Sequence, residues 1–181
     1  MKHSFKKVKD SEVVISELML PSRTNFNGKI HGGYILSLMD QIAFACDSKH
    51  SENYCVTASV DTVDFLLPIE VGELVTLKAS VNFVGHSSMV IGIRVEAENI
   101  QTGKTKHCNS SYFTMVAKAN DNTNVPVPGV ILTEEQQVRR FLKSLKRKAT
   151  KVKRRENFKA TDFTPQDHLE NLEGYRVKLA L

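Results

Sequence analysis

The sequence is poor in cysteine and contains no long hydrophobic run. It has three cysteines in 181 residues, Cys46, Cys55 and Cys108, and no two of them have CxxC spacing. This argues against a disulfide framework and a zinc knuckle, so we interpret the cysteines as small buried hydrophobic residues. No apolar run approaches the ~20 residues that cross a bilayer, and the basic N-terminal segment leads into no apolar stretch typical of a secretory signal. We therefore expect a cytoplasmic protein without a membrane partner.

The composition is that of a globular protein, with 41% hydrophobic and 25% charged residues. Its charge is uneven, because residues 133–157 hold ten Lys or Arg and three Glu, a net charge of +7, whereas the whole chain carries +5 and the remainder therefore −2. A stretch rich in Asn, Pro and Gly precedes this basic segment and breaks regular structure. We predict a main domain over 1–118, a linker over 119–132, a basic amphipathic helix over 133–157 and a tail over 158–181.

Hydrophobic residues alternate with polar ones in two neighbouring segments, which predicts half-buried strands. These segments, 75–83 and 89–97, flank the turn-like GHSS at 85–88 and together predict an antiparallel hairpin. Three further segments are rich in β-branched and aromatic residues, at 11–20, 54–68 and 106–117. The sequence therefore predicts about five strands.

Between these strands lies YILSLMDQIAFACDS, residues 34–48, in which apolar positions cover almost the whole circumference of a helix. Such a helix is typical of one that is surrounded by other structure. We predict an α+β fold with one long central helix wrapped by a curved antiparallel sheet.

One carboxylate, Asp40, interrupts this apolar helix. It stacks on Leu36 and Phe44 at spacings of four residues, where an ionised carboxylate costs several kcal/mol unless it is partnered. Asp40 either belongs to a solvated polar strip with Ser37 and Gln41 or has a function.

The approach to the helix favours a function. In NFNGKIHGG two glycines stand at the expected helix start, where the first backbone N–H groups lack intrahelical partners and are open to a ligand oxygen. A glycine pair alone is more often a tight turn. HGG seven residues before the aspartate, with two asparagines upstream, is a more specific pattern for an oxyanion site.

These residues resemble the hotdog-fold acyl-CoA thioesterases of the bacterial acyl-CoA hydrolase type. The resemblance covers roughly residues 11–148 and is carried by SELMLPSRTNFNGKIHGGYILSLMDQIAFACDS, by the segment from NYCVTASVDTVDFLLP to VEAENIQTG, by SYFTMVAK and by VPVPGVILTEEQ. It implies a hotdog fold, an acyl-CoA substrate, paired protomers with active sites at their interface, and hexamers built as trimers of dimers.

The resemblance also implies roles for single residues. Asn25 and Asp40 fall on the catalytic pair of the family, with Asp40 as general base or, alternatively, as a nucleophile that forms a mixed anhydride. Asn25 would orient water or hold the thioester oxygen, and the N–H groups of Gly32 and Gly33 would stabilise the oxyanion. His31 would contact the substrate carbonyl or shape the turn. We expect no metal and no separate cofactor, because coenzyme A is part of the substrate.

Contacts with coenzyme A follow from the same resemblance. One strand segment would line the pantetheine channel, a hairpin turn would lie along it, and two basic side chains would meet the nucleotide. These residues are, in turn, Ala58, Ser59 and Val60; Ser87, Ser88 and Met89; and Arg94 and Lys148. Without the resemblance, the same positions are ordinary features of a strand, a turn and a solvated basic surface.

The basic segment has the pattern of a capped helix, since Thr133 precedes Glu134, Glu135 and Gln136 and apolar residues recur at helical spacing. Its basic face would suit the phosphates of coenzyme A or solvent. Two alternatives to hydrolysis stay open: an acyl-CoA-binding sensor or regulator, and a hotdog dehydratase or hydratase using His31 with Asp40. Nucleic-acid binding is disfavoured, because the sequence has no recognition helix-turn-helix and no aromatic stacking set among the charges.

Overall fold

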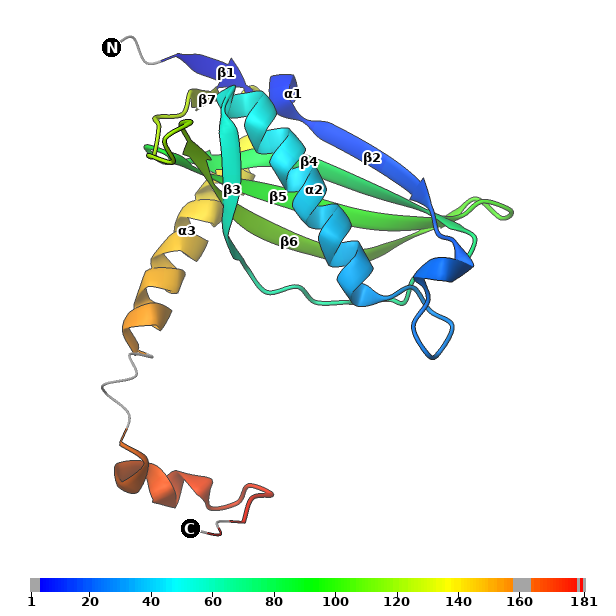
Figure 1. The fold of residues 1–181 in the computed structure, drawn as a ribbon, viewed down its shortest axis with the longest axis vertical. Coiled ribbons are helices and arrows are strands. Elements are labelled where there is room, and N and C mark those ends of the chain that lie inside the picture. Colours follow the sequence, from blue (N-terminus) through cyan, green and yellow to red (C-terminus); the bar gives the residue numbers. More distant parts are fainter. Residues whose placement is uncertain (1–3, 158–163, 179, 181) are drawn as a thin grey trace. The chain divides into compact units, whose positions relative to one another are not determined.

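The computed structural model describes residues 4–157, 164–178 and 180 of the chain. Contacts between Cα atoms divide the chain into two compact units, residues 1–144 and 145–181. The first unit contains a five-stranded antiparallel sheet and the long helix α2, Gly32–Ser51 (Figure 1). This confirms the predicted fold class.

The sheet has the strand order β2-β4-β5-β6-β3. Its strands are β2 (Val13–Leu18), β3 (Tyr54–Val60), β4 (Glu73–Val84), β5 (Ser88–Asn99) and β6 (Lys104–Lys118). The predicted hairpin is β4 and β5, in which Leu77 pairs with Val95 and Lys78 with Arg94. Because neighbouring residues of a strand point to opposite faces, the first pair enters the core and the second lies on the other face. The alternation in the sequence therefore located both strands and both faces.

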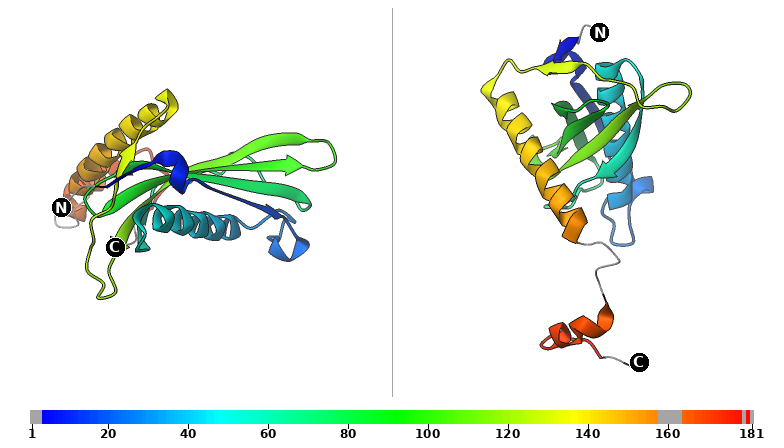
Figure 2. Two further views of the ribbon diagram at one scale, coloured as in Figure 1. Left: turned by 90° about the horizontal axis from the view of Figure 1, so that it is seen from above. Right: turned by 90° about the vertical axis from the view of Figure 1, so that its left-hand side faces the viewer.

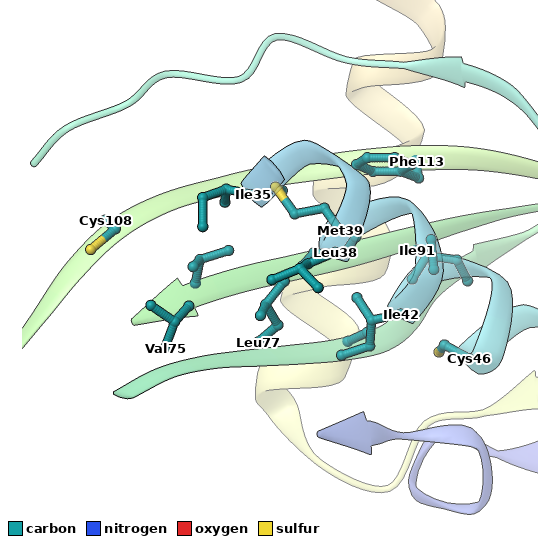
Figure 3. Packing of buried hydrophobic residues seen from close by; sticks show 14 of the residues in the cluster. Ile35, Leu38, Met39, Ile42, Cys46, Val75, Leu77, Ile91, Cys108 and Phe113 are labelled. Carbon is teal, nitrogen blue, oxygen red and sulfur yellow. The ribbon is translucent and has the colours of Figure 1, made fainter. Parts of the chain in front are cut away.

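Helix α2 packs on the apolar face of the sheet through one stripe of side chains (Figure 3). The stripe contains Ile35, Leu38, Met39, Ile42 and Cys46, all of which are buried. The opposite side of the helix is exposed, and it includes Asp40 and Phe44. The expectation that the helix is surrounded on all sides is therefore wrong for a single chain, because the sheet covers one side only.

Three short elements were not predicted. They are β1 (Phe5–Lys7), α1 (Val8–Ser11) and β7 (Gly129–Ile131), and β1 pairs with β7 in parallel as a separate two-stranded sheet. The segment 119–132, expected from its composition to be a linker, thus contributes a strand. Two 3-10 helices, η1 (Pro21–Arg23) and η3 (Pro165–Leu172), complete the described elements.

Helix α3, Glu135–Asn157, corresponds to the predicted basic helix. The backbone N–H of Thr133, just before the helix, donates to Gln137 Oε1 at 2.9 Å. The side chain that caps the start of the helix is therefore Gln137 and not Gln136. In the first unit, Phe141 of α3 lies against Phe83 of β4 with ring centroids 5.2 Å apart. Residues 135–144 therefore pack on the face of the sheet opposite α2 (Figure 2).

Among the described residues, no helix is both long enough and apolar enough to cross a membrane. The predicted tail begins with residues 158–163, which lie outside the described part of the chain.

Candidate active site

Asp40 is held by a hydrogen bond from the neighbouring edge strand. Thr57 Oγ1, on β3, donates to Asp40 Oδ1 at 2.6 Å. Both residues border a cleft of about 560 Å³, here called the Asp40 cleft, which is lined by Asp40, Gln41, Phe44, Tyr54, Cys55, Val56, Thr57 and Met115. Asp40 is exposed in the single chain, so the expected burial of this carboxylate is wrong for one protomer. Sequence reasoning did not identify Thr57.

The side chain of Thr57 faces α2, and an irregularity in β3 follows directly after it. Thr57 pairs with Met115 of β6, whereas Ser59 pairs with the adjacent Thr114, so Ala58 is an extra residue in the strand. Adjacent residues of β6 point to opposite faces, and the bulge therefore sends Thr57 and Ser59 to opposite faces as well. Met115 is buried in the core, which places Thr57 on the same face as α2.

Asn25 lies in a tight loop that ends at the helix start. Its Oδ1 accepts hydrogen bonds from the N–H groups of Asn27 at 2.9 Å and Lys29 at 3.2 Å, and Gly28 takes the left-handed conformation with φ of 72°. The amide oxygen of Asn25 therefore holds the loop, which leaves its Nδ2 group as the donor available to a ligand. Asn25 is exposed and does not line the Asp40 cleft of its own chain.

His31 is the N-cap of α2. Its Nδ1 accepts a hydrogen bond from the N–H of Gly33 at 3.0 Å, and its carbonyl oxygen accepts from the N–H of Tyr34 at 3.0 Å. The expectation of a free N–H at Gly33 is therefore wrong, because the imidazole already occupies this donor. Since the side chain of an N-cap residue satisfies a helix N–H that would otherwise lack a partner, the contacts of His31 favour the turn-shaping interpretation.

Gly32 keeps the N–H group that the cap does not use. No side chain or carbonyl among the described residues accepts a hydrogen bond from it. A Cβ added at Gly32 would lie 3.2 Å from Cζ of Phe65, tighter than an ordinary contact. The absence of a side chain thus allows the Phe65 ring to lie against the helix start, and one backbone donor remains for an oxyanion.

The residues expected along the pantetheine lie on two strands that flank β6. Ala58, Ser59 and Val60 end β3, while Ser88 begins β5 on the other side of β6. Val116 of β6 pairs with both Ser88 and Val56, and the carbonyl oxygen of Ser87 accepts from the N–H of Ala117 at 2.9 Å. The turn is therefore level with the start of β3 and not with its end, and a shared pantetheine channel stays a prediction.

Met89 and Arg94 do not join these residues. The side chain of Met89 is fully buried in the core, so only its backbone is open to a ligand. Arg94 lies on the face opposite α2, where its Nε donates to Glu96 Oε1 at 2.8 Å. The structure therefore does not bring these two side chains to the Asp40 cleft. Lys148 belongs to the second unit, so its contact with the nucleotide stays a prediction.

Large apolar side chains are exposed beside the cleft and in the segment that follows β3. They are Phe44, Tyr54, Val60, Phe65, Leu66 and Leu67, between 42% and 63% exposed. Phe26, at the tip of the Asn25 loop, is completely exposed. Exposed apolar side chains in this number are typical of a protein–protein interface.

Asp47 is a buried carboxyl one turn before the end of α2. Ser48 Oγ donates to its Oδ1 at 3.4 Å, while its Oδ2 has no hydrogen-bond partner among the described residues. Burial raises the pKa of Asp47 from 3.8 to about 7. The nearby thiol of Cys46 is also buried, and this raises its pKa to about 12. All three cysteines are free and buried, which confirms their interpretation as small core residues.

In the described ranges 4–157, 164–178 and 180, no group of three or more His, Cys, Asp or Glu side chains is arranged to hold a metal ion.

Comparison with known proteins identifies relatives of the chain. The Thioesterase superfamily profile matches residues 27–104. Protein VdlD of Helicobacter pylori (strain ATCC 700392 / 26695) is 41% identical over 143 residues, which cover 79% of this chain and 82% of VdlD.

Solved structures share the fold over most of their length. A hexameric acyl-CoA thioesterase in its apo form has a TM-score of 0.82 at 34% identity, covering 83% of this chain and 97% of that one. A second structure is that of the acyl-CoA hydrolase of Staphylococcus aureus in complex with butyryl coenzyme A, coenzyme A and coenzyme A disulfide. It has a TM-score of 0.80 at 29% identity, and the match covers 87% of this chain and 96% of that one. The same hydrolase is known as three alanine variants, of an aspartate, an asparagine and a threonine.

Proposed function

Because this chain belongs to the acyl-CoA thioesterases of the hotdog-fold thioesterase superfamily, we propose that it hydrolyses acyl-CoA to a free carboxylic acid and coenzyme A with Asp40 as general base. The hydrogen bond from Thr57 to Asp40, at the edge of a cleft, carries this proposal. It fixes one carboxylate oxygen and leaves the other, Oδ2, to accept a proton from water. The water oxygen then attacks the thioester carbonyl carbon, and the thiolate leaves with little need of an acid.

Asn25 and Gly32 supply the donors for the oxyanion in this proposal. The carbonyl oxygen of the thioester gains negative charge during the attack, and N–H groups aimed at it stabilise that charge. Asn25 offers Nδ2, since its Oδ1 is engaged in the loop. Gly32 offers its backbone N–H, since the cap uses the N–H of Gly33. Two donors are therefore present without a role for His31 beyond the cap.

A second copy of the chain completes the site in this proposal. Asn25 and Asp40 are both exposed, and they do not share a cleft within one protomer. The exposed apolar side chains beside the cleft match what a second protomer would cover, and a structural neighbour is a hexameric acyl-CoA thioesterase. Covering α2 in this way would remove Asp40 from solvent, which strengthens its electrostatic interactions with substrate. We propose a dimer as the minimal unit, assembled into a trimer of dimers.

The Staphylococcus aureus hydrolase supports the choice of residues. Its alanine variants replace an aspartate, an asparagine and a threonine, and each carries a number three higher than Asp40, Asn25 and Thr57 here. The asparagine variant was obtained in complex with coenzyme A. The three residue numbers differ by the same amount although the residues lie on a helix, a strand and a loop. This favours the same aspartate, asparagine and threonine as site residues in this chain.

We place the pantetheine along the exposed end of β3. Ala58, Ser59 and Val60 lie on β3, an edge strand of the sheet, and the outer side of an edge strand is where an extended chain can bind. Every step of the reaction then uses a protein group or water, so we propose that no metal and no separate cofactor takes part.

Release of thiol from a panel of acyl-CoA esters of graded length tests the function. We expect turnover by the wild-type protein and a loss on the order of 10²–10⁴-fold in kcat for Asp40→Asn. The variant should keep the oligomer and its affinity for free coenzyme A, because the amide has nearly the shape of the carboxyl.

Three outcomes separate the alternatives. Binding of acyl-CoA without thiol release by the wild type would indicate a sensor. Release of an enoyl or hydroxyacyl product with the thioester intact would indicate a dehydratase or hydratase. Turnover of Asp40→Asn at the wild-type rate would refute the assignment of the base.

A further inference from the structure

The side chain of Arg23 lies over the aromatic ring of Tyr34, beside the start of α2. Cζ of Arg23 is 4.4 Å from the centre of the ring, within the ~6 Å over which a cation and an aromatic face attract each other. Arg23 ends the 3-10 helix η1, and Tyr34 lies in the first turn of α2. In the part of the chain that the structure describes, Arg23 forms no ion pair with a carboxylate. Tyr34 is therefore the side chain that fixes the position of the guanidinium.

Tyr34 is itself fixed from another direction. Its hydroxyl donates a hydrogen bond to a carboxylate oxygen of Glu17 on β2, and its side chain packs against the hydrophobic core. This hydrogen bond raises the pKa of Tyr34 above its ordinary value of 10.0, so the hydroxyl stays protonated and keeps donating at neutral pH. Glu17, Tyr34 and Arg23 thus form a row of contacts, here called the Arg23 clamp, which joins β2, the first turn of α2 and η1.

The backbone of Arg23 closes the loop that carries Asn25. The N–H of His31 donates to the carbonyl oxygen of Arg23 at 2.9 Å, and Thr24 and Ile30 form an antiparallel bridge beside this bond. Asn25 follows Arg23 by two residues, in a loop that its own Oδ1 holds together. The position of Asn25 therefore depends on how the stem of the loop is held.

From these contacts we infer that Arg23 is a positioning residue, because the Arg23 clamp fixes the stem of the loop and thereby the place of Asn25 Nδ2. The inference rests on the proposed role of Asn25 in hydrolysis, and Arg23 itself touches no reacting atom in it. Tyr34 belongs to the same helix turn as Gly32, which offers the second oxyanion donor. The clamp therefore sets the two donors relative to each other, and a displacement of about 1 Å at such a site can cost much of the rate.

Hydrogen exchange of the full-length protein, measured by mass spectrometry on peptides that cover residues 24–31, tests whether the clamp holds the loop. We expect about fivefold faster exchange in Arg23→Gln than in the wild type, because the hairpin opens more often without the cation–π contact. Arg23→Lys keeps a cation over the ring and should stay close to the wild type. Lys7→Gln is the control, since Lys7 is exposed, its change removes the same charge, and it lies on β1 at the opposite end of α2 (Figure 1).

Steady-state thiol release tests whether the place of the loop matters for catalysis. Arg23→Gln should lower kcat about fivefold with little change in KM, because the displaced donor serves the oxyanion that forms only during the reaction. Arg23→Lys should restore most of the rate. Tyr34→Leu removes the ring, and the double variant of Arg23→Gln with Tyr34→Leu should lose no more than Tyr34→Leu alone, since both changes remove the same contact.

Unchanged exchange or an unchanged kcat in Arg23→Gln would overturn the inference. So would losses in kcat that multiply in the double variant, or a Lys7→Gln variant that behaves like Arg23→Gln. Absence of thiol release by the wild type would instead refute the proposed function. The exchange measurement needs no turnover, and it would then still decide whether the clamp holds the loop of Asn25.

Discussion

Thr57 on β3 and Asp40 on α2 are joined by a hydrogen bond of 2.6 Å between hydroxyl and carboxylate. The bond connects the edge strand of the sheet to the exposed side of the central helix. Because the hydroxyl occupies Oδ1, the direction of Oδ2 is set before any substrate arrives. A carboxylate held in one orientation places the water that it activates in one position relative to the thioester.

We expect Thr57→Val to lower kcat by about tenfold with little change in KM, because the carboxylate loses its orienting donor but keeps its charge. Thr57→Ser should restore most of the rate, since serine retains the hydroxyl. Steady-state thiol release by the two variants checks this. Turnover of Thr57→Val at the wild-type rate would contradict a role for the hydroxyl, and an equal loss in both variants would show that the methyl group of Thr57 is needed as well.

A site shared between two protomers predicts complementation. Asn25→Asp keeps the oxygen that holds the loop and removes the Nδ2 donor, and Asp40→Asn removes the base. When the two inactive variants are unfolded together and reassembled in equal amounts, half of the dimers should be mixed, with one intact site of two. About a quarter of the wild-type activity should return, as two-fold symmetry requires.

The control is each variant reassembled alone, which should remain inactive. If the mixture also stays inactive although mass spectrometry shows mixed oligomers, both residues act within one chain.

His31→Ala should lower the free energy of unfolding by about 1 kcal/mol, because the N–H of Gly33 loses its acceptor at the start of α2. His31→Asn should recover most of this loss, since asparagine is among the best N-cap residues. Urea unfolding at one protein concentration measures both. Recovery of stability without recovery of thiol release would show that the imidazole also contacts the substrate.

Asp47 predicts a pH dependence of stability. Its folded-state pKa is raised to about 7 by burial, whereas the unfolded chain releases this proton near 3.8. Between these values the folded state binds more protons than the unfolded state, so the stabilisation is full at acid pH and is lost as the pH rises towards 7. The free energy of unfolding should thus be lower near pH 8 than near pH 5 by roughly 2 kcal/mol on account of this group.

The variant Asp47→Asn isolates the contribution of the Asp47 carboxyl to the pH dependence of stability, because an amide does not ionise. The variant should be more stable than the wild type near pH 8, and the difference should shrink as the pH falls. Chemical unfolding at a fixed protein concentration checks this, since the stability of an oligomer depends on that concentration. A difference that does not change with pH would contradict the prediction.

The sequence predicted the elements with clear periodicity. Alternation at 75–83 and 89–97 located β4 and β5, and the apolar run at 34–48 located α2 within three residues at each end. It did not predict that one side of α2 is exposed, because an apolar residue such as Phe44 has the same pattern whether it meets its own sheet or a second chain. The short strands β1 and β7 were not predicted, since three residues are too few to show an alternation of hydrophobic and polar residues.

The site was predicted less completely than the fold. Asp40, Asn25 and the helix start were identified from local patterns, but the hydroxyl of Thr57 reaches Asp40 across 17 residues of sequence. Nothing in YCVTASV alone distinguishes it from an ordinary strand threonine. On the face of the sheet opposite α2, a second cleft likewise joins Lys78 and Arg94 to Arg139 and Lys143 from three distant segments, and only the fold brings them together.

The extra residue in β3 gives this strand one position at which its length can change. With Ala58 removed, Thr57 and Ser59 would become consecutive in a regular ladder, so Thr57 could still pair with Met115 and Ser59 with Thr114. A residue removed from the regular part of β3 between Cys55 and Thr57 would instead move the residues on one side of the deletion to the opposite face of the sheet. We therefore infer that β3 tolerates the loss of Ala58 far better than the loss of Val56, because the hydroxyl of Thr57 then stays turned to the helix.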